Sequence, residues 1–345
     1  ITSPLDGSRL KTQLLKIKGV AVSPNGVKQV QISLDNGTTW QDASGTAAWV
    51  YNWENPADGT YTILSKIIDS DDNEETPGAG ISIEIDSSLP TTTGHLAGDE
   101  TWSGTVILTG DVTVPDGITL TIEPGTTIKA LALNDDQNGG DDNSRIELVV
   151  DGSIIAAGTP DSPVLFTSTA SSPAKADWHG LRIRPQTAGD AIALSHCIVE
   201  YCTTGIAYLG DTASRDFSLT DSVIRYAGTD GLYVYGTNAA DFEVTLTGND
   251  IHDINRYGLY YYVYGSGSRM NGTIAGNTVH HTSQHGLYFY FNNARGTTST
   301  VHVSDNEIYQ TGNNSGYAGI YVNEYRNSTA FYASGNHIHD NAGYG

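Results

Sequence analysis

Seven tyrosines recur at two alternating positions in the C-terminal part of the sequence, where their side chains could bind a ligand. They are Tyr233, Tyr235, Tyr260, Tyr262, Tyr288, Tyr290 and Tyr321. Residues such as Leu232 and Leu259 precede them, so a strand period of two turns the apolar residues inward and the tyrosines outward. Because tyrosine combines apolar area with a hydroxyl, we predict a binding face for sugar rings or for another protein surface. A ladder that only stabilises the fold is the alternative.

The segment from Asn134 to Asn143, NDDQNGGDDN, gathers oxygen ligands around a pair of glycines. Carboxylate and carbonyl oxygens on a sharply bent loop are what Ca²⁺ prefers. We therefore predict Ca²⁺ as a cofactor, bound by Asp135, Asp136, Asn138, Asp141 and Asp142. The spacing differs from that of an EF-hand, and a solvated acidic loop is the alternative.

Three histidines share one register, each directly after an isoleucine or valine. They are His252, His280 and His339, and Tyr309 occupies the same position between the last two. His252 and His280 could reach one metal ion or perform acid–base chemistry, with a neighbouring carboxylate orienting the imidazole. Because a repeat copies its residues from unit to unit, we favour a hydrogen-bonding ladder at the turns.

Residues that would cleave a polysaccharide are sparse. A lyase needs a base, usually Lys or Arg, and no lysine follows Lys175. A glycosidase needs two carboxylates about 5–10 Å apart on one sheet. The acidic pairs Asp135-Asp136 and Asp141-Asp142 instead fall in a predicted loop. We predict no catalytic residues, with a polysaccharide lyase, glycosidase or epimerase as the alternative to a non-enzymatic protein.

The elements that must position these residues belong to a repeat. A polar residue stands two places before a valine or isoleucine, with gaps of 28, 28, 29 and 30 residues, at Asp221, Asn249, Asn277, Asn306 and Asn336. A glycine followed by Ile or Leu recurs at Gly205, Gly231, Gly258, Gly286 and Gly319. Such units have no room for a crossover helix and predict the coils of a parallel β-helix. We expect Asn249, Asn277, Asn306 and Asn336 to adopt the left-handed corner conformation and to stack their amides as a structural ladder.

Residues 1–87 predict a different domain. Five alternating segments bounded by turn signals such as Asn25-Gly26 indicate a β-sandwich, at residues 14–20, 27–33, 48–53, 60–68 and 80–85. The stretches VKQVQISLDNGTTWQDASGTAAWVYNW and DGTYTILSKIIDSDDNEE resemble a bacterial Ig-like domain. Such domains mostly serve as spacers on exported proteins, so the resemblance implies an extracellular or cell-surface location.

Residues 101–345 resemble the right-handed parallel β-helix family. The resemblance rests on SGTVILTGDVTVPDGITLTIEPGTTI, DWHGLRI and the coils GNDIHDINRYGLYYY and GNTVHHTSQHGLYFY. The polar residues 88–100 are predicted as a linker. The expected fold class is therefore all-β, with an Ig-like β-sandwich followed by a right-handed parallel β-helix. This fold carries lyases, glycosidases, epimerases, adhesins and structural proteins, so it does not select one function.

The composition argues against several partners. Among 345 residues, 39 acidic and 17 basic side chains give a formal charge of −22, which repels nucleic acids and anionic headgroups. No apolar run approaches the roughly 18 residues of a membrane span, so we also expect no membrane insertion. We expect Cys197 and Cys202 to be ordinary thiols, because residues five apart reach disulfide distance only across a sharp turn.

The last coil starts at about Ala330 and reaches Gly345 without a recognisable capping repeat. We expect the chain to be a piece of a longer protein, or its open end to pair with another subunit. We therefore predict an extracellular or cell-surface structural or adhesive protein. Its tyrosine ladder would mediate self-association, as a filament, sheath or surface layer, or contact with a polysaccharide.

Overall fold

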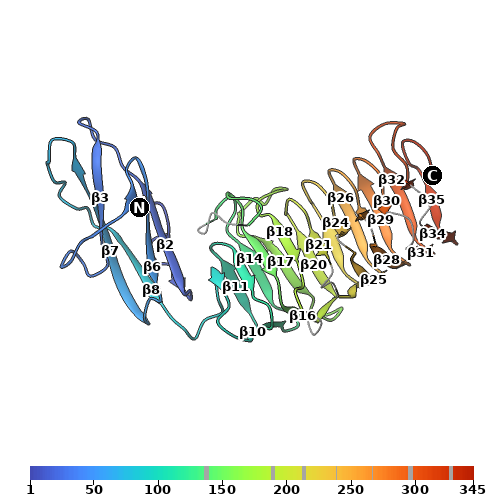
Figure 1. Ribbon diagram of the computed structural model, residues 1–345, viewed down its shortest axis with the longest axis horizontal. Coiled ribbons are helices and arrows are strands. Elements are labelled where there is room, and N and C mark those ends of the chain that lie inside the picture. Colours follow the sequence, from blue (N-terminus) through green and yellow to red (C-terminus); the bar gives the residue numbers. More distant parts are fainter. Residues whose placement is uncertain are drawn as a thin grey trace.

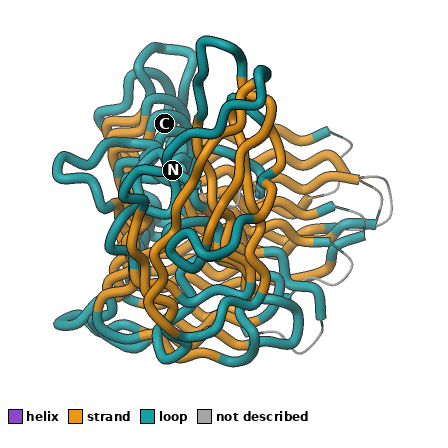
Figure 2. The backbone as a smooth tube through the Cα atoms, turned by 90° about the vertical axis from the view of Figure 1, so that its left-hand side faces the viewer, coloured by secondary structure: helices purple, strands orange, loops and turns teal. Residues whose placement is uncertain are grey.

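The computed structural model describes residues 1–345 except 136–139, 188–190, 212–214, 238, 266, 294–297 and 326–328. The described part of the chain consists of strands, turns and loops, without a helix, and the predicted all-β class is confirmed (Figures 1 and 2). Accordingly, no helix in that part is long and apolar enough to cross a membrane.

The N-terminal domain is a sandwich of two sheets, drawn in blue in Figure 1. One sheet has the order β1 (Arg9–Leu10), β8 (Ile81–Ile85), β7 (Gly59–Asp69), β3 (Val27–Ser33) and β4 (Gln41–Asp42). The other has the order β2 (Leu14–Val20), β6 (Ala48–Glu54) and β5 (Ser44–Gly45). Inward residues such as Leu15, Ile17 and Ile32 form its core. All five strands predicted from the alternation of apolar residues are therefore present, as β2, β3, β6, β7 and β8.

The rest of the described chain winds through three parallel sheets of nine strands each. The tyrosine sheet contains β9 (Gly94–His95), β12 (Val112–Val114), β15 (Glu147–Val150), β18 (Gly180–Ile183), β21 (Ile206–Gly210), β24 (Leu232–Gly236), β27 (Leu259–Gly265), β30 (Leu287–Asn293) and β33 (Ile320–Glu324). The histidine sheet contains β11 (Thr105–Leu108), β14 (Thr127–Ala130), β17 (Val164–Ser168), β20 (Cys197–Glu200), β23 (Val223–Arg225), β26 (Asp250–Ile254), β29 (Thr278–Thr282), β32 (Glu307–Thr311) and β35 (His337–His339). The third sheet contains β10 (Glu100–Trp102), β13 (Thr119–Ile122), β16 (Ser153–Ala157), β19 (Ile192–Ser195), β22 (Phe217–Thr220), β25 (Asp241–Thr247), β28 (Arg269–Ala275), β31 (Ser299–Ser304) and β34 (Thr329–Ser334). Figure 1 shows these coils stacked along the long axis from cyan to red.

The first coil begins inside the segment predicted as a linker. Strand β9 at Gly94–His95 already pairs with β12, and Leu96 packs into the core of the β-helix. Strand β9 was not predicted because it is only two residues long and lies in a polar segment, where no alternation of apolar residues marks it.

Side chains alternate between the core and the outside as predicted in the central coils. Leu232, Val234, Leu259 and Tyr261 have no exposed surface, and the tyrosines beside them face outward. Val322, expected to point inward by the same pattern, is 40% exposed, because β33 is the last strand of its sheet in the described chain.

Asn249, Asn277, Asn306 and Asn336 form a continuous hydrogen-bonded amide ladder at the turn before the histidine sheet. Their predicted left-handed conformation is wrong. The positive φ angles belong to the residue before each of them, at Gly248, Gly276, Asp305 and Gly335. A neighbour in that conformation turns the chain, which leaves each asparagine side chain free to point inward.

The predicted repeat is also misaligned by one residue in one coil. Ser222 donates its backbone N–H to Oδ1 of Asn249, so Ser222, rather than Asp221, begins the ladder. Correspondingly Ile224 is buried, while Val223 is only half-buried. Asp221 is the left-handed corner residue of that coil, with φ of 49°.

Glycine is required at the start of the tyrosine strands because adjacent coils approach closely there. A Cβ atom on Gly231 would lie 2.7 Å from the carbonyl oxygen of Gly258, and one on Gly258 would lie 2.7 Å from that of Gly286. This contact explains the repeated glycine found in the sequence.

Cys197 and Cys202 are both buried and are not joined in a disulfide. Burial raises the pKa of each thiol to about 12, so both stay protonated and unreactive. The interpretation of both as ordinary thiols is confirmed.

Candidate functional site on the tyrosine sheet

The seven tyrosines form two columns on the outside of four neighbouring strands. The first column pairs Tyr233 with Tyr260, Tyr288 and Tyr321 in direct register. The second pairs Tyr235 with Tyr262 and Tyr290, where Asn323 takes the next place. We call these seven side chains the tyrosine face.

The rings of the tyrosine face are in contact with one another along the helix axis. Centroids in the first column are 5.2, 5.0 and 5.4 Å apart, and those in the second are 5.2 and 4.8 Å apart. Tyr260 and Tyr288 are nearly parallel, with 5° between their planes. These two rings therefore cover part of each other's flat surface, whereas Tyr262 and Tyr290 meet edge to face, with 80° between their planes. The hydroxyls point outward, because side chains stand away from the sheet.

Three hydroxyls of the tyrosine face, those of Tyr233, Tyr260 and Tyr288, stay protonated at neutral pH. Burial, with a smaller contribution from the neighbouring Tyr235, raises the pKa of Tyr233 to about 12. Burial also raises the pKa of Tyr260 and Tyr288. Each hydroxyl can thus both donate and accept a hydrogen bond.

An ion pair borders the tyrosine face at the start of its strands. Nε of Arg256 donates to Oδ1 of the buried Asp230 at 2.7 Å. The pair holds the guanidinium over the rings of Tyr257 and Tyr260, 5.1 and 5.7 Å from their centroids. Arg256 is therefore fixed in position, and its charge is neutralised by Asp230.

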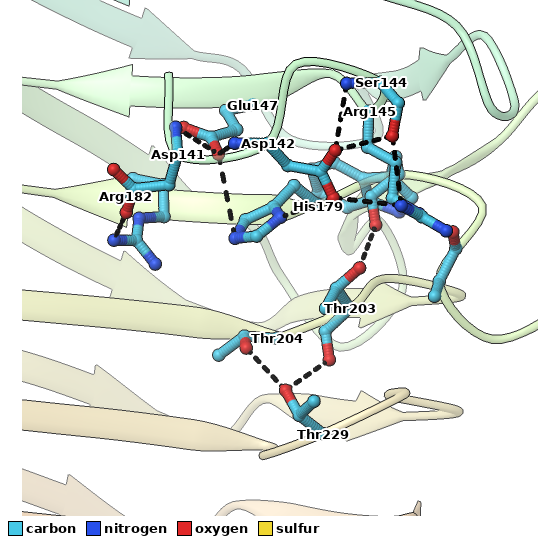
Figure 3. A network of polar contacts seen from close by, with 12 residues as sticks. Asp141, Asp142, Ser144, Arg145, Glu147, His179, Arg182, Thr203, Thr204 and Thr229 are labelled. Atoms are coloured by element: carbon cyan, nitrogen blue, oxygen red, sulfur yellow. Dashed lines mark hydrogen bonds and ion pairs between the residues drawn. The ribbon is translucent and has the colours of Figure 1, made fainter. Parts of the chain in front are cut away.

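The same sheet carries charged residues in its earlier coils. Arg182 occupies the register position of Tyr233, two strands before it, and pairs with Asp141 (Figure 3). Beside it, Oε1 of Glu147 accepts the backbone N–H groups of Asp141 and Asp142 at 3.0 and 3.1 Å. His179 lies close, with Nε2 3.7 Å from Oε1 of Glu147.

Asp111 and Glu147 form a pair of buried carboxylates at this end of the sheet, and each has 5% or less of its surface exposed. Oδ1 of Asp111 accepts the N–H of Glu147 at 2.7 Å, while its Oδ2 has no hydrogen-bond partner among the described residues. Burial raises the pKa of Asp111 to about 7, with a further contribution from Asp135. Burial and the charge of Asp111 raise that of Glu147 to about 8. Ionising both groups is therefore costly in the folded state.

The predicted calcium ligands that the structure describes contact different partners. Asp142 pairs with Arg145 at 2.9 Å and Asp141 pairs with Arg182, so arginine already neutralises these two carboxylates. Asp135 is buried beside the backbone N–H of Asp111. Asp136 and Asn138 lie outside the described residues. The calcium site stays a prediction.

We expect saturating Ca²⁺ to raise the thermal unfolding midpoint above that in chelator. An ion that binds only the folded chain stabilises it by about 2.7 kcal/mol at one hundred times its dissociation constant. Melts with and without Ca²⁺ test this, and Asp135→Asn should remove the difference. An unchanged midpoint in the parent protein would mean that the segment is a solvated acidic loop.

Asp111 and Glu147 were missed in the sequence because no adjacent acidic pair marks them. The register of the neighbouring strands would have indicated them. Glu147 pairs with Gly180, and Asp111 directly precedes β12 as Glu147 precedes Leu148. In the coils of β12 and β15, two acids thus take the place of the glycine column. Extending the glycine alignment towards the N-terminus would have revealed them.

Family models match three stretches of the chain. A bacterial Ig domain matches residues 1–64, a pectate-lyase-like β-helix domain matches residues 95–220, and a right-handed β-helix region matches residues 179–345. The chain therefore carries a bacterial Ig domain followed by a right-handed β-helix, of which residues 95–220 match the pectate-lyase-like model.

Two solved structures are similar to parts or most of this chain. Fibronectin(III)-like modules of Clostridium thermocellum CbhA match 26% of this chain and 94% of their own, with 20% identity and a TM-score of 0.23. A family 28 exopolygalacturonase of Yersinia enterocolitica matches 94% of this chain and 96% of its own, with 8% identity and a TM-score of 0.19. Both scores are too low to support a functional argument. No curated protein matches the sequence.

Proposed function

We propose that this is an extracellular, non-catalytic protein that binds polysaccharide through the tyrosine face. The observation that supports the proposal is the two in-register columns of outward tyrosines on β24, β27, β30 and β33. Six of these tyrosines are half-buried and Tyr321 is exposed, and an outward aromatic surface of this length exceeds the usual scatter of apolar surface residues.

The ring packing favours contact through hydroxyls. Because Tyr260 is stacked on both Tyr262 and Tyr288, a ligand there meets ring edges and hydroxyl groups, with one pair of tyrosine hydroxyls in each central coil. A glycan laid along the helix axis offers a matching row of hydroxyls. Its hydrogen-bonding groups would then repeat with the coils.

Charge favours a neutral polysaccharide. The formal charge of −22 repels polyanions, and Arg256 and Arg182 beside the face are both paired with carboxylates. We therefore expect tighter binding to uncharged glycans than to polygalacturonate.

Replacing Tyr233, Tyr260 and Tyr288 by Phe should weaken glycan binding about tenfold to a thousandfold, since each lost hydrogen bond costs roughly 0.5–1.5 kcal/mol. The rings and their stacking remain, so the fold should be unaffected. Affinity electrophoresis in a panel of neutral and acidic polysaccharides measures the change, and a thermal melt checks the fold.

Tyr332→Phe is the matched control, because this exposed tyrosine lies on β34 of the third sheet. Replacing the same three face residues by Ser should also weaken binding. Full binding by the Phe and Ser variants alike would contradict the proposal. Concentration-dependent filaments of the parent chain that the Ser variant cannot form would instead support self-association as the role of the face.

A carbohydrate-active enzyme is the second candidate, favoured by the Asp111 and Glu147 pair. Their raised pKa values suit groups that exchange protons near neutral pH. Their burial, with Asp141 and Asp142 bonded to Glu147, argues against substrate access. Incubation with polysaccharides, followed by assays for unsaturated products and reducing ends, decides between the candidates. Turnover that is lost in Glu147→Gln would establish the enzyme.

A further inference from the structure

Two clusters of histidine and carboxylate side chains lie on the outside of the histidine sheet, on a different sheet from the tyrosine face. The first cluster is Asp250 and His252 on β26 with His280 on β29. The second cluster is Glu307 on β32 with His337 and His339 on β35. In each cluster, one ligand atom from every residue lies within 4.8 Å of the others.

The strand geometry explains both clusters. Residues two apart on a strand point to the same side, so Asp250 accompanies His252 and His337 accompanies His339. Parallel pairing then brings the third ligand alongside, since His252 pairs with His280 and Glu307 pairs with His337. Each cluster thus combines two ligands on one strand with one on its neighbour.

In the first cluster, the ligand atoms face one another. Nε2 of His280 lies 3.2 Å from Oδ1 of Asp250. That oxygen is shielded from solvent and accepts no hydrogen bond from the described residues. Nδ1 of His252 lies 2.8 Å from Oδ2 of Asp253, an arrangement in which Nδ1 carries the proton and Nε2 keeps its lone pair.

The second cluster repeats this arrangement. Nδ1 of His339 lies 2.9 Å from Oδ2 of Asp340, and its Nε2 is shielded without a hydrogen-bond partner, 3.6 Å from Oε1 of Glu307. Nδ1 of His337 is 3.9 Å from the same oxygen. Asp253 and Asp340 both have positive φ angles, 57° and 52°, at the corner after their histidines. Aspartate tolerates this conformation, and in both coils its carboxylate orients the preceding imidazole.

We propose that each cluster binds one divalent transition-metal ion of the Zn²⁺ class, through two imidazole nitrogens and one carboxylate oxygen. Imidazole suits Zn²⁺, Cu²⁺ and Ni²⁺, and a carboxylate hydrogen-bonded to the other ring nitrogen is the usual support of a metal-binding histidine. Three protein ligands leave a fourth position for water or an outside ligand.

Ion binding requires a small rearrangement of the first cluster. The rings of His252 and His280 are stacked 4.8 Å apart with 6° between their planes. Bonds of about 2.0–2.1 Å to one ion hold two nitrogens at most about 4.2 Å apart, so the rings must tilt towards each other. Both side chains lie outside the core but are only 15% exposed, so the tilt must loosen their ring contacts with Tyr226 and Tyr309.

The alternative is that this column only stacks. Tyr309 continues the column at 4.8 Å from His280 and 5.2 Å from His339, and a stacked ladder alone would explain those contacts. A stacked ladder does not explain why Asp250 approaches Nε2 of His280 and Glu307 approaches Nε2 of His339. It also does not explain why Asp253 and Asp340 lie at hydrogen-bond distance from Nδ1 of the histidines before them.

Titration of the chelator-treated chain with Zn²⁺ by isothermal calorimetry tests the proposal. We expect two ions per chain with micromolar affinity. Asp250→Asn combined with His280→Ala should bind one ion, and His337→Ala combined with His339→Ala should also bind one. Titration with Co²⁺ should give a visible d–d absorption band in the parent that weakens in each variant.

His302→Ala is the matched control, because His302 stacks on Tyr332 on the third sheet and belongs to neither cluster. Asp250→Asn alone preserves shape, so it tests the first cluster if the double variant fails to fold. No binding by the parent, or two ions in both cluster variants, would overturn the proposal. Glycan binding by the tyrosine face is measured separately and does not depend on this outcome.

Discussion

Asn277→Ala should lower the free energy of unfolding by about 4 kcal/mol, because it removes the middle of the amide ladder. Nδ2 of Asn277 donates to the carbonyl oxygen of Leu246 and to Oδ1 of Asn306, both at 2.9 Å. Its Oδ1 accepts the backbone N–H and the side-chain amide of Asn249, at 3.0 and 2.9 Å.

The expected cost follows from burial. Asn277 is 2% exposed, so alanine would leave polar groups on two neighbouring coils without partners in a dry interior. Each such group costs about 1–3 kcal/mol, and the groups are coupled, so their costs do not simply add. Asn277→Asp should be at least as damaging, because it places a second acceptor against the oxygens that Nδ2 now serves.

Urea unfolding measures both variants, with Asn313→Ala as the control. Asn313 is exposed and contacts Asn314 through its side chain, so its loss should change stability by less than about 0.5 kcal/mol. Equal stability of Asn277→Ala and the control would show that the ladder does not hold the coils together.

The second large effect is a pH dependence of stability set by Asp111 and Glu147. Their pKa values are raised in the folded chain, from 3.8 to about 7 and from 4.5 to about 8. The folded state therefore binds these protons more tightly than the unfolded state. Their contribution to stability is complete below about pH 4 and is lost as the pH rises through 7 and 8.

Glu147→Gln should remove much of this loss. The amide keeps Oε1 as the acceptor for the N–H groups of Asp141 and Asp142, and it carries no charge towards Asp111. One pKa unit corresponds to about 1.4 kcal/mol, and nearby cations offset part of the repulsion, so we expect a gain of about 2 kcal/mol at pH 8.5. At pH 5 the variant and the parent should be equally stable.

Chemical unfolding at a series of pH values in chelator tests this, with the exposed Glu123→Gln as the control. A parent protein whose stability does not fall between pH 5 and pH 8.5 would contradict the expectation. So would a Glu147→Gln variant that is destabilised equally at both pH values.

Much of the fold could be predicted because periodicity reports directly on packing. The alternation around Leu232 and Leu259 fixed which side chains enter the core, and the repeated glycine marked where coils touch. Corner geometry could not be read from residue types, since glycine or aspartate takes the left-handed position before each asparagine.

The polar sites were harder to predict because they depend on contacts between coils. Glu147 looks like an ordinary strand residue until its register with Gly180 places it beside Asp111 under a loop. The Asp-x-His and His-x-His patterns of β26 and β35 were visible in the sequence, but the pairing of neighbouring strands completes both clusters. The aromatic columns followed from the two-residue period, whereas the relative ring orientations, such as the stacking of Tyr260 on Tyr288, required three dimensions.

Successive ladder residues are separated by 27, 28, 29 and 30 positions although their amides remain in contact. The extra residues of the longer coils must therefore lie in the loops that join the strands, because the spacing between paired strands does not change. Insertions in these loops can accumulate as the sequence evolves without changing the distance between tyrosine side chains on neighbouring strands. Such a β-helix can vary the loops between its strands extensively while the tyrosine face keeps its spacing.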